Sequence, residues 1–210
     1  MKTNYDAVMQ SIVSAIRPDQ KPRLMLQCCC APCSSAVLER LIEFFDLTLL
    51  YYNPNTWPES EYHRRGAQFK KLLDGDGLAG KVDIIYSDWR SEDFELVSAG
   101  FEAYPEGGPR CERCFRMRLR ETARLAKEKG YDWFCTTLSV SPHKNSELIN
   151  RIGQELEEEY GVKYLPSDFK KREGYKRSIV LSAEYELYRQ DYCGCRFSYE
   201  AAVKQREGKR

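Results

Sequence analysis

Short apolar runs alternate with longer segments of helical periodicity along the chain, and this alternation limits the fold more than any other feature. The apolar runs that predict strands are 23–28, 46–53, 81–88, 132–140 and 162–166. Helices are predicted at 4–16, 34–45, 59–73, 111–129, 145–160 and 178–188, with a further one starting near Glu92. Because the strands are continuously apolar, helices should cover both faces of the sheet. The pattern predicts a three-layer α/β fold with a mostly parallel sheet.

The chain of 210 residues is long enough for one domain with a full hydrophobic core. We expect a single α/β domain over 1–210, with an N-terminal helical extension at 1–20 and a polar tail at 199–210. Val8, Ile12 and Ile16 lie at a spacing of four, which indicates a short helix at 4–16. No apolar run reaches the roughly 18 residues that a membrane helix needs. The polar and acidic residues near the N-terminus do not fit a signal peptide, so we expect a cytoplasmic protein.

Nine cysteines are clustered rather than spread along the sequence. Because thiols stay reduced in the cytoplasm, metal binding or redox chemistry explains them better than a disulfide framework does. Four of the nine lie in LQCCCAPCSS, residues 26–35, directly after the first predicted strand. In doubly wound folds the ligand site lies at such strand-to-helix turns. The stretch therefore predicts a thiol-bearing site at the carboxyl edge of the sheet.

Two pairs of cysteines have the spacing C-x-x-C, Cys30 with Cys33 and Cys111 with Cys114. This spacing lets both sulfur atoms of a pair turn toward one metal. Cys111 and Cys114 lie three residues apart at the start of a predicted helix, where they share a face and where thiolates are favoured. Two such pairs supply four thiolates, enough for a tetrahedral zinc or for an iron–sulfur cluster. Spacing alone does not choose between these two.

A third pair, Cys193 and Cys195, flanks a single glycine in RQDYCGCRFS. With Cys29 the pair could complete a second thiolate site near the first, or it could form a redox disulfide or serve packing alone. Cys28 should point to the side of the strand opposite Cys29, because successive side chains alternate. Cys135 lies inside an apolar strand, so we expect Cys28 and Cys135 to pack in the core.

The histidines and glycines exclude several other kinds of site. His63 and His143 are the only histidines, too few for a histidine-rich metal site. His63 is expected on a solvated helix face, whereas His143 lies in a loop at a strand end and is either a substrate contact or a plain loop residue. GDGLAGK, residues 75–81, imitates the start of a phosphate loop, but Val82 and a strand follow where Ser or Thr and a helix are required. Nucleotide binding is therefore unsupported.

Basic residues gather locally although the net charge of the chain is only +1. One basic segment is 110–129, and the other is KKREGYKR at 170–177, while acidic residues gather at 155–159. Tyrosines near the basic segments could stack on nucleobases, and the cations could contact RNA phosphates. The alternative is that each basic run forms a solvated helix face.

Six motifs together resemble the QueH family of epoxyqueuosine reductases. They are CCAPCS, NPNTWPESEYHRR, RCERCFRMRLRETA, TTLSVSPHKN, DFKKREGYKRS and LYRQDYCGCRFS, and they occur in one order from Cys29 to Ser198. The resemblance implies a Rossmann-like fold similar to that of the adenine-nucleotide α-hydrolases. It also implies reduction of the epoxide of epoxyqueuosine at the wobble position of tRNA, the last step of queuosine biosynthesis.

The same resemblance implies the cofactors and their ligands. A [4Fe–4S] cluster and a second, mononuclear iron are expected, with zinc possible in the purified protein and no cobalamin. The residues carried over are Cys30, Cys33, Cys111 and Cys114 for the cluster, and Cys29, Cys193 and Cys195 for the adjacent metal. Some relatives have Asp at the position of Cys33. Many have His and a non-cysteine residue where this chain has Gln27 and Cys28.

The expected reaction needs two electrons and two protons. A protein such as ferredoxin or flavodoxin should supply the electrons, which a cluster passes on one at a time. An open-sited second iron could bind the epoxide oxygen as a Lewis acid. Tyr192, Asp168 and His143 are the candidate proton sources. Two alternative functions stay open, a tRNA-thiolating enzyme that uses ATP and a zinc-stapled RNA-binding module without catalysis.

Overall fold

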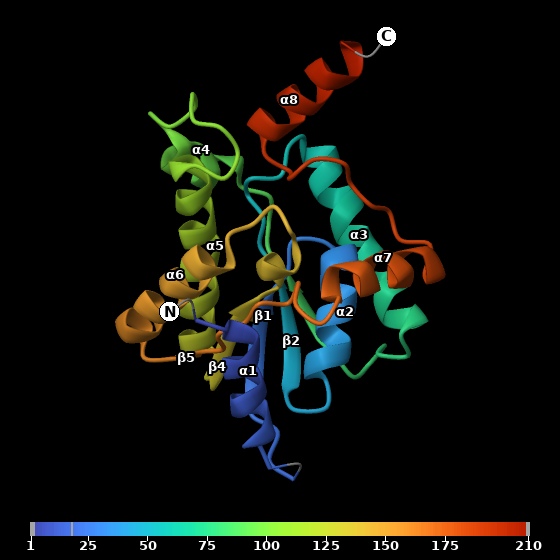
Figure 1. Ribbon diagram of the computed structural model, residues 1–210, viewed down its shortest axis with the longest axis vertical. Coiled ribbons are helices and arrows are strands. Elements are labelled where there is room, and N and C mark those ends of the chain that lie inside the picture. The colour runs from blue at the N-terminus through green and yellow to red at the C-terminus, as the bar shows by residue number, and fades with distance from the viewer. Residues whose placement is uncertain (1–2, 18, 209–210) are drawn as a thin grey trace.

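The computed structural model describes residues 3–17 and 19–208, and a parallel sheet of five strands lies at its centre (Figure 1). The strands are β1 (Arg23–Gln27), β2 (Asp46–Tyr51), β3 (Asp83–Tyr86), β4 (Trp133–Thr136) and β5 (Lys163–Tyr164). Their order across the sheet is β3-β2-β1-β4-β5, and every neighbouring pair is parallel. All five predicted strands are present, and each is shorter than its predicted range.

Helices cover both faces of this sheet. They are α1 (Tyr5–Ser14), α2 (Ala31–Leu41), α3 (Glu59–Gly75), α4 (Ser91–Ser98), α5 (Pro109–Glu128), α6 (Ser146–Tyr160), α7 (Gly174–Glu184) and α8 (Arg196–Glu207). Leu24 and Leu26 of β1 pack with residues of α1, α2 and α3, whereas Met25 packs with residues of α5 and α6 on the other side. This alternation confirms the predicted three-layer α/β fold, and α7 extends the layer beside α2 (Figure 1).

The first helix is present, as predicted, and its inner face is centred on Met9 and Val13, which are buried. Ile12 and Ile16 are partly buried and pack against the same core, whereas Val8 is 37% exposed. Asp6 is also buried and forms an ion pair with Arg40 of α2, which ties the helix to the layer below it.

The fourth predicted strand was too long. The strand β4 ends at Thr136, and a single 3-10 turn, η1 (Thr137–Val140), follows it. The Thr136 hydroxyl accepts a hydrogen bond from the Leu138 amide at 3.1 Å, which turns the chain out of the sheet. The prediction of a strand over 132–140 was therefore wrong beyond Thr136, and the turn forms one wall of the site described below.

The C-terminal segment also differs from the prediction. Residues 199–207, expected as a polar tail, belong to α8, which starts directly after Cys195 and projects from the top of the molecule in Figure 1. The helix is held at its start, where Phe197 packs against Phe94 at a centroid distance of 6.3 Å. Residues 209 and 210 lie outside the described part. Among the described helices, none is long and apolar enough to cross a membrane.

Candidate metal centre

The thiols gather at the carboxyl edge of the sheet, beside the point where the strand order reverses. The chain leaves β1 toward β2 on one side and reaches β4 on the other, and ligands of open α/β sheets bind in the crevice outside this point. Cys28, Cys29 and Cys30 follow β1 directly, and Thr137 follows β4. The Cys29 Sγ and the Thr137 Oγ1 are 3.8 Å apart. The thiol loop thus lies at the predicted edge of the sheet.

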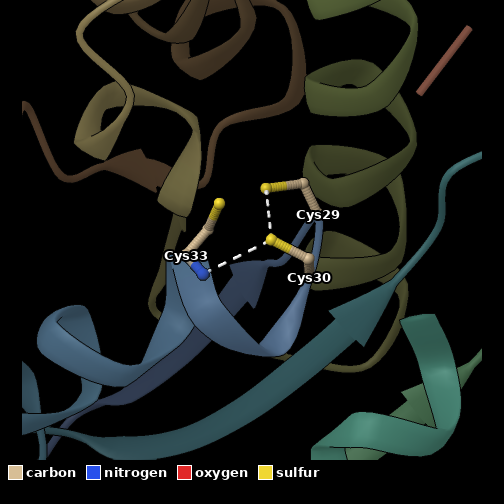
Figure 2. A group of neighbouring side chains, drawn as sticks. All are labelled: Cys29, Cys30 and Cys33. Carbon is tan, nitrogen blue, oxygen red and sulfur yellow. Dashed lines mark hydrogen bonds between the residues drawn. The ribbon is translucent and has the colours of Figure 1, made fainter. Parts of the chain in front are cut away.

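Three thiols of this loop form a compact group. The sulfur atoms of Cys29, Cys30 and Cys33 all lie within 4.8 Å of one another and point into one space (Figure 2). Cys30 is the N-cap of α2, and its sulfur accepts a hydrogen bond from the Cys33 amide at 3.3 Å. A helix N-terminus favours a negative charge, so this position suits a thiolate.

The other four thiols of interest lie close to this group. Cys111 and Cys114 lie in the first turns of α5, and Cys193 and Cys195 lie in the segment between α7 and α8. Cys114 and Cys195 share a small buried cluster. Burial raises the pKa of Cys114 to about 12, and the nearby thiols of Cys193, Cys195 and Cys111 add to this rise. Cys193 lines one cavity with Cys29 and Cys33 and a smaller one with Cys111.

The seven thiols that the sequence singled out as metal ligands therefore lie along one edge of the fold, and the sulfur atoms of Cys29, Cys30 and Cys33 converge within 4.8 Å. They group by chain segment, Cys29 with its loop neighbours and Cys193 and Cys195 with the start of α5. This grouping differs from the division that the resemblance implied, which separated Cys29 from Cys30 and Cys33. The assignment of each thiol to a cluster or to a second metal stays a prediction.

Cys28 and Cys135 differ from the other cysteines. Both are fully buried, and the sulfur atom of each donates a hydrogen bond at 3.3 Å to a backbone carbonyl, of Leu50 and Leu165 respectively. Burial raises the pKa of the Cys135 thiol to about 12 and raises that of Cys28 well above its ordinary value. Both thiols are thus protonated core groups, which confirms the packing role predicted for them.

The loop that carries Cys193 and Cys195 is anchored by α3. Gly194 adopts a φ of +134°, and a Cβ at this position would lie 2.9 Å from the Arg65 Nη1. Arg65 is 2% exposed, donates to the Cys193 carbonyl at 3.2 Å and forms an ion pair with Glu61 at 2.8 Å. Glycine is therefore required between the two cysteines. Sequence reasoning missed Arg65 and Glu61, although both lie in the quoted motif NPNTWPESEYHRR.

A cavity of about 600 Å³ opens beside the thiols. Among its lining residues are Cys29, Cys33, Cys193, Lys144, Gln190 and Tyr192. This volume is typical of a small-molecule site. Burial opposes the charged form of Lys144, but the thiols of Cys193 and Cys29 outweigh it and raise the Lys144 pKa above its ordinary value. Sequence reasoning missed Lys144 and Gln190, which lie in two of the quoted motifs.

The candidate proton sources lie at different distances from this cavity. Tyr192 and His143 line it, and the Tyr192 hydroxyl donates to the Trp57 carbonyl at 2.6 Å. Burial raises the pKa of Tyr192 to about 12. Asp168 is not among the lining residues and forms an ion pair with Lys170 at 2.8 Å. His63 has a side chain that is 66% exposed, as predicted for a solvated helix face.

The donor set fits a thiolate-bound metal centre. Three N–H groups point at sulfur atoms of the predicted ligands. They are the Cys33 amide and the Gln190 Nε2, both to Cys30 at 3.3 and 3.1 Å, and the Gly107 amide to Cys111 at 3.2 Å. Such hydrogen bonds stabilise a negatively charged sulfur more than a neutral thiol. The three converging thiols and the N–H groups that point at these sulfur atoms thus fit a metal cluster.

The arginine-rich helix α5 has a different character. Arg116 and Arg120 form ion pairs with Glu155 and Glu159 of α6 at 2.5 and 3.2 Å, and Arg124 pairs with Glu121 of its own helix. These arginines form a solvated, charge-compensated face. In the second basic segment four cations also pair with acids, namely Lys170, Arg172, Lys176 and Arg177.

Comparison with known proteins identifies the family. The family model described as "Epoxyqueuosine reductase QueH" matches residues 24–201. The chain is 42% identical over 197 residues to Epoxyqueuosine reductase QueH of Streptococcus pyogenes serotype M1, covering 92% of this chain and 77% of the relative. It is also 42% identical over 209 residues to the enzyme of that name from Staphylococcus epidermidis, covering 97% and 87%.

Among solved structures, the U34-tRNA thiolase NcsA from Methanococcus maripaludis, described with its [4Fe-4S] cluster, aligns with a TM-score of 0.47. The sequence identity is 12%, and the alignment covers 96% of this chain and 72% of the thiolase. The family assignment comes instead from the family model and from the two relatives, which together span the thiol loop, α5 and the segment before α8. On these matches, the chain belongs to the QueH family of epoxyqueuosine reductases.

Proposed function

We propose that this protein reduces epoxyqueuosine to queuosine at the wobble position of tRNA in the cytoplasm, as the last step of queuosine biosynthesis. Family membership makes it an epoxyqueuosine reductase. The observation that supports the location of the reaction is the cavity of about 600 Å³ in which Cys29, Cys33 and Cys193 adjoin Lys144 and Tyr192. In this reaction the epoxide takes up two electrons and two protons, both C–O bonds break, and an alkene and water are formed.

We propose that the seven thiols hold two metal sites. The ligands of a [4Fe–4S] cluster would be Cys30, Cys33, Cys111 and Cys114, and those of a mononuclear iron, or of zinc in purified protein, would be Cys29, Cys193 and Cys195. When bound, the cluster supplies single electrons received from a ferredoxin or flavodoxin, and the second metal supplies Lewis acidity toward the epoxide oxygen. No cobalamin is required.

The cavity-lining residues then have distinct roles. Lys144 places a cation beside Cys29 and Cys193, where negative charge develops on the departing oxygen. Tyr192 is the proposed proton donor because it lines the cavity, and its hydroxyl would have to turn away from the Trp57 carbonyl, to which it donates at 2.6 Å. Asp168, which we also predicted as catalytic, is the weaker candidate because it is paired with Lys170 outside the lining.

The cavity also suits an RNA base presented from a single-stranded loop. Tyr175 and Arg189 line it, and the Arg189 guanidinium lies 5.9 Å from the centroid of the Tyr175 ring. Unstacked bases commonly bind on tyrosine rings and guanidinium planes, and enzymes that modify bases take them into such pockets. We propose that the anticodon loop approaches this opening rather than the ion-paired face of α5.

The decisive experiment is anaerobic purification followed by iron and sulfide analysis and an assay on epoxyqueuosine-containing tRNA. We expect about four sulfides and more than four irons per chain, as one [4Fe–4S] cluster and a second iron require. A colourless protein with one zinc and no sulfide, even after anaerobic reconstitution, would instead support the non-catalytic RNA-binding module. Retention of both the cluster and full activity after replacing Cys193 and Cys195 with Ser would exclude the second metal site.

A further inference from the structure

One buried cation, Arg118, has no carboxylate partner among the residues that the structure describes. Arg118 lies on α5, four residues after Cys114 and seven after Cys111, a spacing that puts all three on one face of the helix. Its side chain does not reach solvent, since the residue is only 2% exposed. The guanidinium is therefore held inside the protein, one helical turn beyond two of the predicted metal ligands.

The hydrogen-bond partners of Arg118 are neutral. Its Nη2 donates to the Asn53 Oδ1 at 2.5 Å, and its Nε is buried without a hydrogen-bond partner. Asn53 is itself bonded to neutral groups, accepting from the Gln27 Nε2 at 3.3 Å and donating to the Cys28 carbonyl at 2.9 Å. Among the ion pairs of the described residues, none includes Arg118.

The other buried arginines are compensated in ways that Arg118 is not. Arg65 has the carboxylate of Glu61 at 2.8 Å, and Arg110 donates to backbone carbonyls, among them that of Glu102 at 2.7 Å. A buried charge without a counter-charge is strongly unfavourable, so native structures pair it or bind an ion beside it. Arg118 thus requires negative charge from something other than a carboxylate of the described chain.

The groups that can provide this charge are the thiols. Asn53 connects Arg118 to the backbone of Cys28, which immediately precedes Cys29. The positive charge of Arg118 lowers the pKa of Cys28, Cys29 and Cys114, and for Cys114 only the opposing effect of burial is larger. Thiolates fixed by a metal carry permanent negative charge, whereas free thiols at neutral pH do not.

We propose that Arg118 is the fixed counter-charge of the metal centre and sets the reduction potential of the cluster. The inference rests on the function proposed above. A buried cation stabilises the reduced cluster, which carries one more negative charge, more than the oxidised one, and so raises the potential. Arg118 is neither a ligand nor a cavity-lining residue, and it acts as a positioning and tuning residue.

The test separates the charge of Arg118 from its hydrogen bond. Arg118→Gln keeps a donor toward Asn53 but removes the charge, whereas Arg118→Lys keeps the charge. The measurement is a redox titration of the cluster-loaded enzyme, monitored by electron paramagnetic resonance. At a fixed potential, we expect the Arg118→Gln variant to have a ratio of reduced to oxidised cluster at least tenfold lower than the wild type. That change corresponds to about 59 mV for a one-electron couple. We expect Lys to change the ratio less than about threefold.

Arg116→Gln is the matched control, because Arg116 lies on the same helix but is paired with Glu155 at the surface. It should leave the ratio unchanged. Loss of the cluster in Arg118→Gln, with a normal potential in Arg118→Lys, also supports the inference. Equal behaviour of the Gln and Lys variants, whether normal or without a cluster, overturns it. A wild-type chain that binds no iron and sulfide contradicts the proposed function instead.

Discussion

The carboxyl edge of the sheet and the outer surface of α5 and α6 both carry clusters that the composition singles out, thiols in one and arginines in the other. On the outer surface each of Arg116 and Arg120 has a glutamate partner, so the charges are satisfied within the protein. At the sheet edge Arg118 and Lys144 have no carboxylate partner among the ion pairs of the described residues, and three thiols converge. Cations without a carboxylate partner, together with converging thiols, therefore distinguish the candidate site from the solvated surface, whereas composition alone does not.

The largest expected effect comes from replacing one thiol at the sheet edge. Cys33→Ser should remove the proposed cluster and reduce reductase activity to background. This loss exceeds the roughly 100-fold typical of changes to the outer partners of a metal site. Iron and sulfide content and turnover of epoxyqueuosine tRNA are the measurements.

The control is Cys28→Ser, in the same loop but facing the core. It should retain iron, sulfide and most of the activity, because the Cys28 sulfur is bonded to a backbone carbonyl and faces away from the cavity. If both variants lose the cluster equally, the distinction between core and edge thiols is wrong.

The next effect concerns the cation of the cavity. Lys144→Met should lower kcat about 100-fold, the usual consequence of removing one group that stabilises developing negative charge. Iron content should stay at the wild-type level, since Lys144 is not a proposed ligand. Steady-state assays over a range of tRNA concentrations would measure this, and an unchanged kcat with a raised KM would instead assign Lys144 to RNA binding.

How much of this could be predicted from the sequence depends on whether the signal is local. The strands and the helix α5 were predicted because apolar runs and helical periodicity are contained within one segment. The location of the thiols at the carboxyl edge of the sheet was predicted because four cysteines follow directly after an apolar run that forms β1. The start of α8 was missed because its residues are polar and a distant contact, of Phe197 with Phe94, holds it.

Residues that act through distant partners were also missed. Lys144 and Gln190 come from loops that are far apart in sequence, and they meet only at the cavity. Arg118 was visible as one of many arginines, but its importance lies in the absence of an acidic partner among the described residues, which no sequence pattern records. The arrangement of thiols by chain segment was likewise not predictable, since spacing shows that two cysteines can share a metal without showing which pairs do.

A smaller effect tests the core thiols through pH. The pKa of Cys135 is raised from 9.0 to about 12 by burial, so the folded state keeps its proton where the unfolded state loses it. The contribution of this thiol is thus complete below pH 9 and is lost as the pH rises toward 12. The stability difference between wild type and Cys135→Ala should fall by up to about 1.4 kcal/mol per pH unit in that window. Denaturant unfolding at several pH values measures it, and a constant difference contradicts it.

The smallest effect is expected on the outer surface. Arg120→Gln removes a cation whose partner is Glu159 at 3.2 Å, with both side chains about half exposed. Surface ion pairs contribute about 0–1 kcal/mol, and a cation already paired adds little to phosphate binding. The dissociation constant for tRNA should therefore change less than about threefold, whereas Arg189→Gln at the cavity should raise it about tenfold. The reverse order in a filter-binding titration at fixed salt would place the RNA on α5, and charge compensation would then fail as a guide to the binding surface of this fold.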